Sequence, residues 1–550
     1  MRRWLRSEFN VSVETCLLVA CVVFVAFYNL PFWRAFLAGR EFTSLATWRL
    51  AGCMFVALTL VHFAALAFVC TRWTTKPILI VLCVINAIAV PFMTGYRVYL
   101  DPAMVRNIVR TDVAEAVEYL SAPFAVTVLI LSAIPIAALS RVKFARKPLG
   151  MSVTRRAIAI CGALGIAALM MLTIMQDVAP MMRTQRQLRY LITPGNYIYS
   201  TVKVARQALR TEPSQRTHWL ARNLHVDGPQ EPQHKPVLFV LVIGETARAD
   251  NFSLNGYARD TNPRLRQLDV INFKNVTSCG TATEVSLPCM LSAVGRQGYE
   301  DDIAAREDGL IQVLSHAGYK VDWYDNNSGC KGTCEGDGIV VRKAAHVENV
   351  ALCKAGRCLD EVLLRALRGQ DLRGGQDRAI VLHQLGNHGP AYYQRYPTTF
   401  ARFKPTCDTS DLRTCTAEQI VASYDNGILY TDYILSEVVR WLTTKSDTYN
   451  AVMLYIGDHG ESLGEAGLYL HGMPYAIAPH VQIHVPMILW LSGGFSNDFG
   501  LNPQCIRSRS AQALSHDNLF HSVVGMLSIE TPNYVPILDV LNGCEREEKG

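Results

Sequence analysis

Five long apolar runs in the first third of the chain constrain its fold more than any other feature. They cover residues 15–32, 51–70, 77–93, 122–139 and 157–175. Each approaches the roughly 20 residues that a helix needs to cross the hydrocarbon core of a bilayer. The first run is too long for a removable signal peptide and lacks a small-residue cleavage site. A buried core is the alternative, but five such runs in succession are hard to bury in a soluble fold. We therefore predict five transmembrane helices.

Basic residues in the short connections set the orientation of these helices. Three arginines precede the first run, and six Lys or Arg residues lie between residues 141 and 156. Lys and Arg are enriched in cytoplasmic loops, so five spans carry everything after residue 175 to the opposite side. The net charge of +6 over 550 residues is weak and indicates no nucleic-acid partner. The sequence thus predicts a membrane protein with a large C-terminal part outside the cytoplasm.

The cysteines divide along the same line. Six of the 16 lie in or beside the apolar runs, and the other ten lie in the C-terminal part. Cysteines in an oxidising compartment form disulfides. Zinc–thiolate ligation is the alternative, because two of them have nearly metal-like spacing, but no second matching knuckle stands nearby. We predict disulfides between sequence neighbours: Cys279 with Cys289, Cys330 with Cys334, Cys353 with Cys358, Cys407 with Cys415, and Cys505 with Cys544.

The chain divides into three predicted parts. Residues 1–176 form the five-helix transmembrane domain, and residues 236–550 form the outer domain. Residues 177–235 form a basic helical linker, which lies either at the membrane interface or in solvent as an ordinary connector. In the outer domain, short apolar runs alternate with helical patterns, as expected for strands buried on both faces of a mostly parallel sheet. We predict an α/β domain with helices on both faces of a sheet formed by residues 237–243, 319–323, 379–385, 451–456 and 485–491.

Three of these predicted strands run into a glycine followed by side chains that can bind a metal. Glu245 follows the first, His388 the third, and Asp458 with His459 the fourth. In open α/β sheets, ligands bind outside the carboxyl ends of the strands, so these side chains are expected to converge. His471 adds another imidazole twelve residues after His459. A set of carboxylates and imidazoles suits a catalytic zinc ion, with manganese as the competitor.

Thr281 is the candidate nucleophile. It follows Gly280 and precedes a helical stretch at residues 285–294. The N–H groups at a helix N-terminus favour an anion such as a phosphate, and a zinc-bound hydroxyl loses its proton readily. The alternative is structural, because Thr281-x-x-Glu284 also matches a capping box. If Thr281 is catalytic, Thr283 or Ser278 is expected to cap the helix instead.

A polar segment, Asp325-Asn326-Asn327-Ser328, ends the second predicted strand and precedes Lys331. Amide and ammonium donors stabilise the charge on the non-bridging oxygens of a phosphoryl group in transfer. A simple polar turn is the alternative. His383 lies inside a predicted strand, and we interpret it as a buried structural residue.

Taken together, these segments resemble the phosphoethanolamine transferases of the Gram-negative envelope, most closely the lipid A type that includes the mobile colistin-resistance enzymes. The resemblance spans nearly the whole chain. It implies an alkaline-phosphatase-like or sulfatase-like outer domain in the periplasm, anchored by five spans in the bacterial inner membrane. The stretches that carry it are residues 99–115, 243–248, 278–290, 325–328, 382–397, 457–461 and 471–474.

The resemblance also implies roles for individual residues. Thr281 would be the nucleophile, and zinc, as one ion or two, would be held by Glu245, Thr281, Asp458 and His459. Further residues would bind the substrate or assist catalysis: Asn327, Lys331, His388 and His471 near the phosphoryl group, and Asn107, Thr111 and Glu115 along one helical face that binds the lipid donor. A packing surface is the alternative for that face.

The implied reaction has two halves. Thr281 attacks the phosphate of phosphatidylethanolamine and releases diacylglycerol, and a phosphate group of lipid A then takes the phosphoethanolamine from Thr281. A histidine acts as acid–base catalyst in each half. The protein would act as a monomer on membrane lipids, without nucleic acid, and the product would bind cationic peptides such as polymyxin less well.

Other functions remain open from the sequence. Transfer to a Kdo or heptose sugar of the lipopolysaccharide inner core would use the same centre. Glycerol-phosphate transfer fits the motifs less well, and a sulfatase would need a Cys or Ser frame that is missing near Thr281. A membrane sensor with a zinc-stabilised outer domain is the non-enzymatic alternative.

Overall fold

The computed structural model describes residues 9–111, 113–145, 148–210, 225–226, 235–299, 307–343, 350–354 and 357–545. The chain forms two compact units. The first comprises Met1–Val105 and Leu120–Arg206, and the second comprises Arg106–Tyr119 and Gln207–Gly550. The short segment 106–119, called the arm below, therefore belongs to the second unit although its flanking helices belong to the first.

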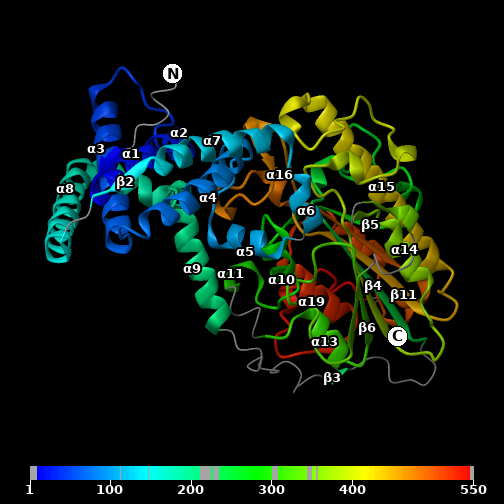
Figure 1. Ribbon diagram of the computed structural model, residues 1–550. Coiled ribbons are helices and arrows are strands. Elements are labelled where there is room, and N and C mark those ends of the chain that lie inside the picture. Colours follow the sequence, from blue (N-terminus) through cyan, green and yellow to red (C-terminus); the bar gives the residue numbers. More distant parts are fainter. Residues whose placement is uncertain are drawn as a thin grey trace. The chain divides into compact units, whose positions relative to one another are not determined.

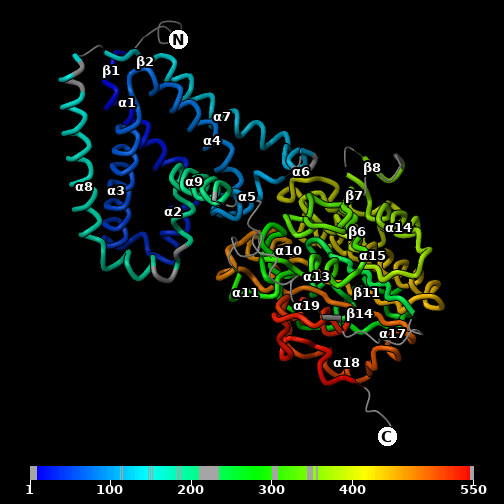
Figure 2. Tube along the Cα trace, turned by 90° about the horizontal axis from the view of Figure 1, so that it is seen from below, coloured from blue at the N-terminus to red at the C-terminus, as the bar shows by residue number. Residues whose placement is uncertain are grey.

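The first unit is built from long apolar helices (Figure 1). Among the described residues, four helices are long and apolar enough to cross a membrane: α3 (Leu45–Val69), α4 (Thr75–Gly95), α7 (Ala122–Ser140) and α8 (Leu149–Thr184). Helices α3 and α8 run side by side, as Figure 2 shows. α8 continues beyond the predicted end of the fifth span at residue 175.

The first apolar run is not one straight helix, contrary to our prediction. It forms α1 (Val13–Val23) and the π-helix η2 (Phe24–Tyr28), followed by α2 (Leu30–Phe36), with a bend of 59° between them. Pro31 lacks a backbone N–H and cannot continue the helical ladder. The buried Asn29 side chain occupies the break, where its amide donates to the carbonyls of Phe24 and Thr193 at 2.9 Å each. The unit thus offers five spans if this bent pair counts as one.

The second unit contains a large central sheet, as predicted. In the described part it has eight strands in the order β15-β5-β14-β11-β4-β10-β6-β7. Strand β14 is antiparallel to both of its neighbours, and the other pairs are parallel. The strands are β4 (Val237–Gly244), β5 (Ile271–Thr277), β6 (Lys320–Asp325), β7 (Ile339–Lys343), β10 (Arg378–His383), β11 (Asn450–Gly457), β14 (His484–Leu491) and β15 (Ala513–Ser515).

Helices cover both faces of this sheet (Figure 1). Helices α10 (Thr283–Met290), α13 (Leu310–His316) and α19 (Asp517–Met526) lie on one side. Helices α14 (Glu361–Arg368) and α15 (Ala417–Thr443) lie on the other. Every residue of β4 and β11 is buried, which explains their continuous apolar sequences.

The register of the central strands determines which side chains meet. β4 and β11 are parallel, with Gly244 opposite Gly457. The residues that follow, Glu245 and Asp458, therefore leave the sheet at the same edge. This alignment is what a site at the carboxyl ends of parallel strands requires.

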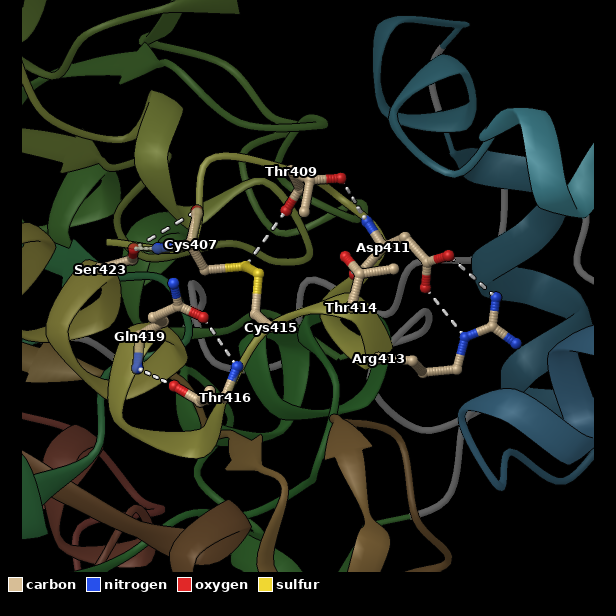
Figure 3. Close-up of a disulfide and its surroundings, with 9 residues drawn as sticks. All are labelled: Cys407, Thr409, Asp411, Arg413, Thr414, Cys415, Thr416, Gln419 and Ser423. Carbon is tan, nitrogen blue, oxygen red and sulfur yellow. Dashed lines mark hydrogen bonds and ion pairs between the residues drawn. A yellow bond between two sulfur atoms is a disulfide. The ribbon is translucent and has the colours of Figure 1, made fainter. Parts of the chain in front are cut away.

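The ten cysteines of the outer domain form five disulfides, joined in the pairs proposed from the sequence. Figure 3 shows the Cys407–Cys415 bridge, which closes the loop ahead of α15. The N–H of Cys407 donates to Ser423 Oγ on α15 at 2.7 Å. Thr416 and Gln419 form a capping box at the start of the same helix. The loop is thus fixed to the first turns of α15.

Candidate functional site

Three side chains with metal-binding atoms converge at the carboxyl ends of β4 and β11. Glu245, Asp458 and His459 are fully or almost fully buried, and one ligand atom from each lies within 4.8 Å of the others. His459 Nε2 is 3.3 Å from Glu245 Oε1 and 3.4 Å from Asp458 Oδ2. We call these three residues the strand-end cluster. The structure therefore brings together three of the four predicted zinc ligands in one metal-competent group.

Backbone contacts orient two members of the strand-end cluster. His459 Nδ1 lies 2.9 Å from the Gly460 carbonyl, so Nδ1 carries the proton and Nε2 faces the two carboxylates. Asp458 Oδ1 accepts from the N–H groups of Thr246 at 3.0 Å and His459 at 2.7 Å. Asp458 Oδ2 is buried and accepts no hydrogen bond from the described residues. Metal-binding side chains characteristically have such supporting partners on the atoms that do not face the ion.

Glu245 is held by three side chains. Thr246 donates to its Oε1 at 2.6 Å, while Thr283 at 2.8 Å and Asn327 at 2.6 Å donate to its Oε2. Gly386 packs against its backbone so closely that a Cβ there would lie 2.4 Å from the Glu245 carbonyl oxygen. The carboxylate is thereby fixed on both oxygens.

The charge balance of the strand-end cluster favours a cation. In the metal-free protein, burial and the nearby Glu245 raise the pKa of Asp458 to about 7. Burial works against a charged His459, but Asp458 and Glu245 together raise its pKa to about 10. Burial also opposes ionisation of Glu245, yet His459 holds the pKa of that carboxyl well below its usual range. Two buried carboxylates need a positive charge. A divalent ion such as zinc, which accepts oxygen and imidazole ligands, fits this donor set.

Thr281 lies in the loop that leads into α10. Its hydroxyl donates to the Met473 carbonyl at 2.6 Å, and its own carbonyl accepts from the Gly472 N–H at 2.8 Å. The preceding Gly280 is required by a close approach, because a Cβ there would lie 2.9 Å from the backbone nitrogen of Ser286. Thr281 is therefore held against the segment that carries His471.

The expectation that Thr283 or Ser278 caps α10 is wrong, and so is the capping-box alternative for Thr281. The N-cap residue is Ala282, and among the described residues no side chain caps this helix. Ser278 donates to the Gly280 carbonyl at 2.6 Å. Thr283 donates to Glu245 instead, and Glu284 pairs with an arginine of the arm. Tertiary contacts at the strand-end cluster have replaced local capping.

Thr283 is a site residue that the sequence analysis missed. Besides its hydrogen bond to Glu245, its hydroxyl lies 3.3 Å from His459 Nε2. Nothing in the local sequence separates its role from that of Thr281, since both are threonines near the start of one helix. Ser286 was missed as well; its hydroxyl donates to the Asp458 carbonyl.

Two further imidazoles extend outward from the strand-end cluster. The His471 ring centroid is 4.3 Å from that of His459 and 5.5 Å from that of His388. His471 Nδ1 lies 3.4 Å from Glu461 Oε2, and His388 Nδ1 lies 2.8 Å from the Gly389 carbonyl. The structure therefore places His388 and His471 together beside the strand-end cluster.

The polar segment after β6 reaches the site through Asn327. Besides Glu245, the Asn327 amide contacts the Gln384 carbonyl at 3.1 Å. His383 is fully buried and lies between Asp325, 2.8 Å from its Nδ1, and the Asn327 amide, 3.3 Å from its Nε2. These contacts fit the interpretation of His383 as a structural residue, because His383 holds the Asn327 side chain in position.

Lys331 lies further along the same loop. Its ammonium donates to Ser328 Oγ at 2.8 Å and to the Ser328 carbonyl at 3.1 Å. Its backbone has a positive φ of 51°, and the Cys330–Cys334 disulfide flanks it. The structure thus fixes the Lys331 ammonium to its own turn and shows no contact between it and the strand-end cluster among the described residues.

The arm does not form one continuous helix, contrary to our prediction. Helix α5 (Pro102–Arg110) ends before Thr111, and α6 (Val113–Glu118) begins after residue 112, which lies outside the described residues. The Thr111 hydroxyl donates to the Asn107 carbonyl at 2.7 Å. Thr favours helix ends over helix interiors, which fits the end of α5 before Thr111. The side chain of Glu115 also lies outside the described part.

Ion pairs fasten the arm to the outer domain. Arg110 Nη1 lies 2.7 Å from Glu284 Oε1, in the first turn of α10. Glu118 pairs with Arg395 and lies 3.5 Å from Arg357 Nε. Arg395 in turn donates to the His388 carbonyl at 2.6 Å. The arm is therefore linked to the first turn of α10 and to His388. The sequence analysis considered Glu284 only as a capping residue and gave Arg110, Glu118 and Arg395 no role.

Comparison with known proteins agrees with this geometry. The phosphoethanolamine transferase EptA/EptB family matches residues 58–209, and the sulfatase family matches residues 238–529. The chain is 36% identical to the phosphoethanolamine transferase EptA of Escherichia coli K12, over 96% of this chain and 97% of that protein. It is 34% identical to the phosphatidylethanolamine transferase Mcr-1 of Escherichia coli, over 86% of this chain and 88% of that protein.

A solved structure covers the same extent. The integral membrane protein lipooligosaccharide phosphoethanolamine transferase A (EptA) from Neisseria meningitidis is 30% identical, with a TM-score of 0.92 over 98% of this chain and 100% of that one. The predictions of a multi-pass membrane protein, a sulfatase-like outer domain on the periplasmic side and transferase activity are confirmed. The chain belongs to the phosphoethanolamine transferase EptA/EptB family.

Proposed function

We propose that this enzyme resides in the bacterial inner membrane and transfers phosphoethanolamine from phosphatidylethanolamine to a phosphate group of lipid A through a covalent intermediate on Thr281. The observation that carries this proposal is the buried strand-end cluster of Glu245, Asp458 and His459, with the imidazoles of His471 and His388 beside it. Thr281 supports it through its hydrogen bond to Met473, two residues after His471. Some relatives are named for the transfer of phosphoethanolamine or phosphatidylethanolamine. These names support our choice of the transferred group and of its donor.

Zinc would be held by Glu245, Asp458 and His459, with Thr281 as the fourth ligand. When bound, zinc lowers the pKa of a coordinated hydroxyl and stabilises negative charge on a phosphoryl oxygen. The orphaned Asp458 Oδ2 and the tautomer of His459 suit one ion at the strand-end cluster. His388 and His471 are the candidate ligands for a second ion.

In the first half-reaction, Thr281 Oγ forms a bond to the phosphorus of phosphatidylethanolamine. The bond from phosphorus to the glycerol oxygen breaks, and that oxygen takes up a proton as diacylglycerol leaves. In the second half-reaction, a phosphate oxygen of lipid A forms a bond to the same phosphorus. The bond from phosphorus to Thr281 Oγ breaks, and that oxygen takes up a proton. His471 is the proposed acid–base group, because its ring lies beside that of His459 and Glu461 Oε2, 3.4 Å from its Nδ1, orients it.

Three groups would stabilise charge on the transferred phosphoryl oxygens. The uncapped N-terminus of α10 offers backbone N–H groups beside Thr281. Asn327 would turn an amide N–H toward the phosphate, and Lys331 would leave its Ser328 contacts to supply an ammonium.

Asn107, Thr111 and Glu115 of the arm would contact the donor lipid. The arm is suitably placed, because its ion pairs join it to α10 and to Arg395.

The acceptor is tested by expressing the enzyme in a Gram-negative host that lacks its own phosphoethanolamine transferases. Mass spectrometry of the extracted lipid A and of the core oligosaccharide then locates the added group, with Thr281→Ala as the inactive control. We expect phosphoethanolamine on lipid A phosphate and reduced polymyxin sensitivity. Modification of a Kdo or heptose sugar alone would replace lipid A as the acceptor. The absence of both modifications, with the enzyme present in the membrane, would refute the proposed transfer.

A further inference from the structure

A second group of metal-competent side chains lies outside the strand-end cluster. Asp250 belongs to the short helix η6 (Ala249–Asn251), His480 begins the one-turn helix α16 (His480–Ile483), and His484 begins β14. One ligand atom from each residue lies within 4.8 Å of the others. We call these three residues the peripheral cluster. It shares no residue with the strand-end cluster.

The two histidines flank the one-turn helix α16, His480 at its first position and His484 directly after its end. They are four residues apart, and their ring centroids are 4.5 Å from one another. Both present Nδ1 to the same carboxylate: His484 Nδ1 is 3.1 Å from Asp250 Oδ1, and His480 Nδ1 is 3.8 Å from Asp250 Oδ2. This is the geometry of a carboxylate and two imidazoles that share one cation.

The other ring nitrogen of His484 already has a partner. His484 Nε2 lies 2.9 Å from the Lys274 carbonyl on β5, so in the neutral ring the proton is on Nε2 and Nδ1 carries a lone pair. That lone pair would face the oxygens of Asp250 unless a proton or a metal ion lay between them. A histidine whose second nitrogen donates to a backbone carbonyl is typical of metal sites.

Asp250 supplies an independent observation. Its Oδ2 atom is buried, and among the described residues it accepts no hydrogen bond. The adjacent Arg248 does not fill this position, because its guanidinium pairs with Glu465 at 2.7 Å. His480 is 63% exposed, so an ion and a coordinating water have access from solvent.

We propose that Asp250, His480 and His484 bind a divalent ion of the zinc class at a site separate from the strand-end cluster. One carboxylate and two imidazoles suit zinc, with water as the fourth ligand. This inference concerns metal binding alone and does not depend on the proposed reaction.

The position of the peripheral cluster suggests what the ion does. The carbonyls of Gln482 and Val481, in α16, accept from the N–H groups of Gly460 and Glu461 at 2.9 and 3.0 Å. These bonds support the loop that carries Asp458 and His459. Asp250 lies five residues after Glu245. An ion at the peripheral cluster would therefore clamp together the two segments that carry the ligands of the strand-end cluster.

The test counts zinc ions in the purified full-length chain after chelation and dialysis against zinc. We expect the His480→Ala/His484→Ala double variant to hold one zinc fewer per chain than the wild type. Glu245→Gln should lose the ion at the strand-end cluster and keep the ion at the peripheral cluster. His316→Ala, a histidine substitution elsewhere in the domain, should lose neither. Equal zinc content in the double variant and the wild type would overturn the inference.

The single variant His480→Ala tests the site without the risk that the double variant misfolds. His480 is largely exposed, so its substitution should leave the fold intact. In competition with a chelator, this variant should bind the peripheral zinc at least about tenfold more weakly than the wild type. Zinc should also raise the unfolding temperature of Glu245→Gln, and His480→Ala in that background should abolish the rise. An unchanged rise or an unchanged affinity would contradict the site, whatever the enzyme's activity.

Discussion

The strand ends and the loops of the catalytic domain contribute different parts of the proposed chemistry. Glu245, Asp458 and His459 follow two fully buried strands whose register fixes their meeting point. Thr281 and His471 lie on loops held by a few hydrogen bonds. Metal binding should therefore depend on the strand-end residues, and group transfer should depend on the loop residues as well. The two can be separated by measuring zinc content and turnover on the same samples.

Glu245→Gln should have the largest effect, because it removes a charged ligand from a buried site. We expect loss of the strand-end zinc together with a fall in transferase activity of at least about 1,000-fold. Zinc analysis and lipid turnover would be measured side by side. Glu437→Gln, a glutamate on α15 that pairs with exposed arginines, is the matched control and should retain both properties.

Thr281→Ala should separate transferase activity from zinc binding. It removes the proposed nucleophile, so activity should fall by about 1,000-fold or more, while the other three ligands keep zinc bound. If zinc and activity disappeared together in this variant, as in Glu245→Gln, the division between strand ends and loops would be lost.

Thr283→Val should have an intermediate effect. Its hydroxyl donates to Glu245 but is not proposed to form a bond to phosphorus. Loss of a hydrogen bond to a metal ligand typically costs about 10- to 100-fold in metal affinity or activity. Titration of zinc against a chelator, together with turnover at saturating zinc, would show it. Recovery of most activity at high zinc is the expected result, whereas complete inactivity would make Thr283 a candidate nucleophile.

Zinc affinity should rise with pH. In the metal-free protein His459 has a pKa raised to about 10, so it is protonated at neutral pH and must lose that proton to bind zinc. Asp458, with a pKa raised to about 7, adds a second proton to displace below neutrality. Affinity should therefore increase by about tenfold per pH unit near pH 8, and more steeply below pH 7. Calorimetry in buffers of different ionisation enthalpy measures this proton release, and zinc binding without proton release would contradict it.

Arg110→Gln should have the smallest effect. It removes the 2.7 Å ion pair between the arm and Glu284 without touching a metal ligand. Because Arg110 is half exposed, the pair contributes modestly, and we expect a fall of about three- to tenfold in kcat/KM for the lipid donor with unchanged zinc content. Arg373→Gln, which removes a fully exposed pair, serves as the control and should change neither quantity.

Much of the fold could be predicted because its signals are local. Five short, largely apolar runs and the glycines that follow three of them indicated a sheet with a metal site at its edge. The other sheet strands were missed because β5 carries polar residues, β7 is an exposed edge and β15 has three residues. The bend at Asn29 depends on a partner at Thr193, far away in the sequence.

The sequence was sufficient to predict the candidate metal ligands. It was not sufficient to predict the residues that hold those ligands in place. Glu245, Asp458 and His459 each follow a strand, so strand order and register suffice to bring them together. Thr283 and Arg395 act through tertiary contacts that no short motif encodes. Local capping rules failed at α10 for the same reason. The Thr283 hydroxyl donates to the buried Glu245 and does not bind the backbone at the start of its own helix.

The most direct test of the central claim is mass spectrometry of peptides after incubating the purified enzyme with phosphatidylethanolamine and no acceptor. We predict a phosphoethanolamine adduct on Thr281 in the wild type and in Thr283→Val, and no adduct in Thr281→Ala. An adduct on Thr283, or intact lipid and unmodified protein with zinc bound at the strand-end cluster, would contradict the assignment of Thr281 as the nucleophile.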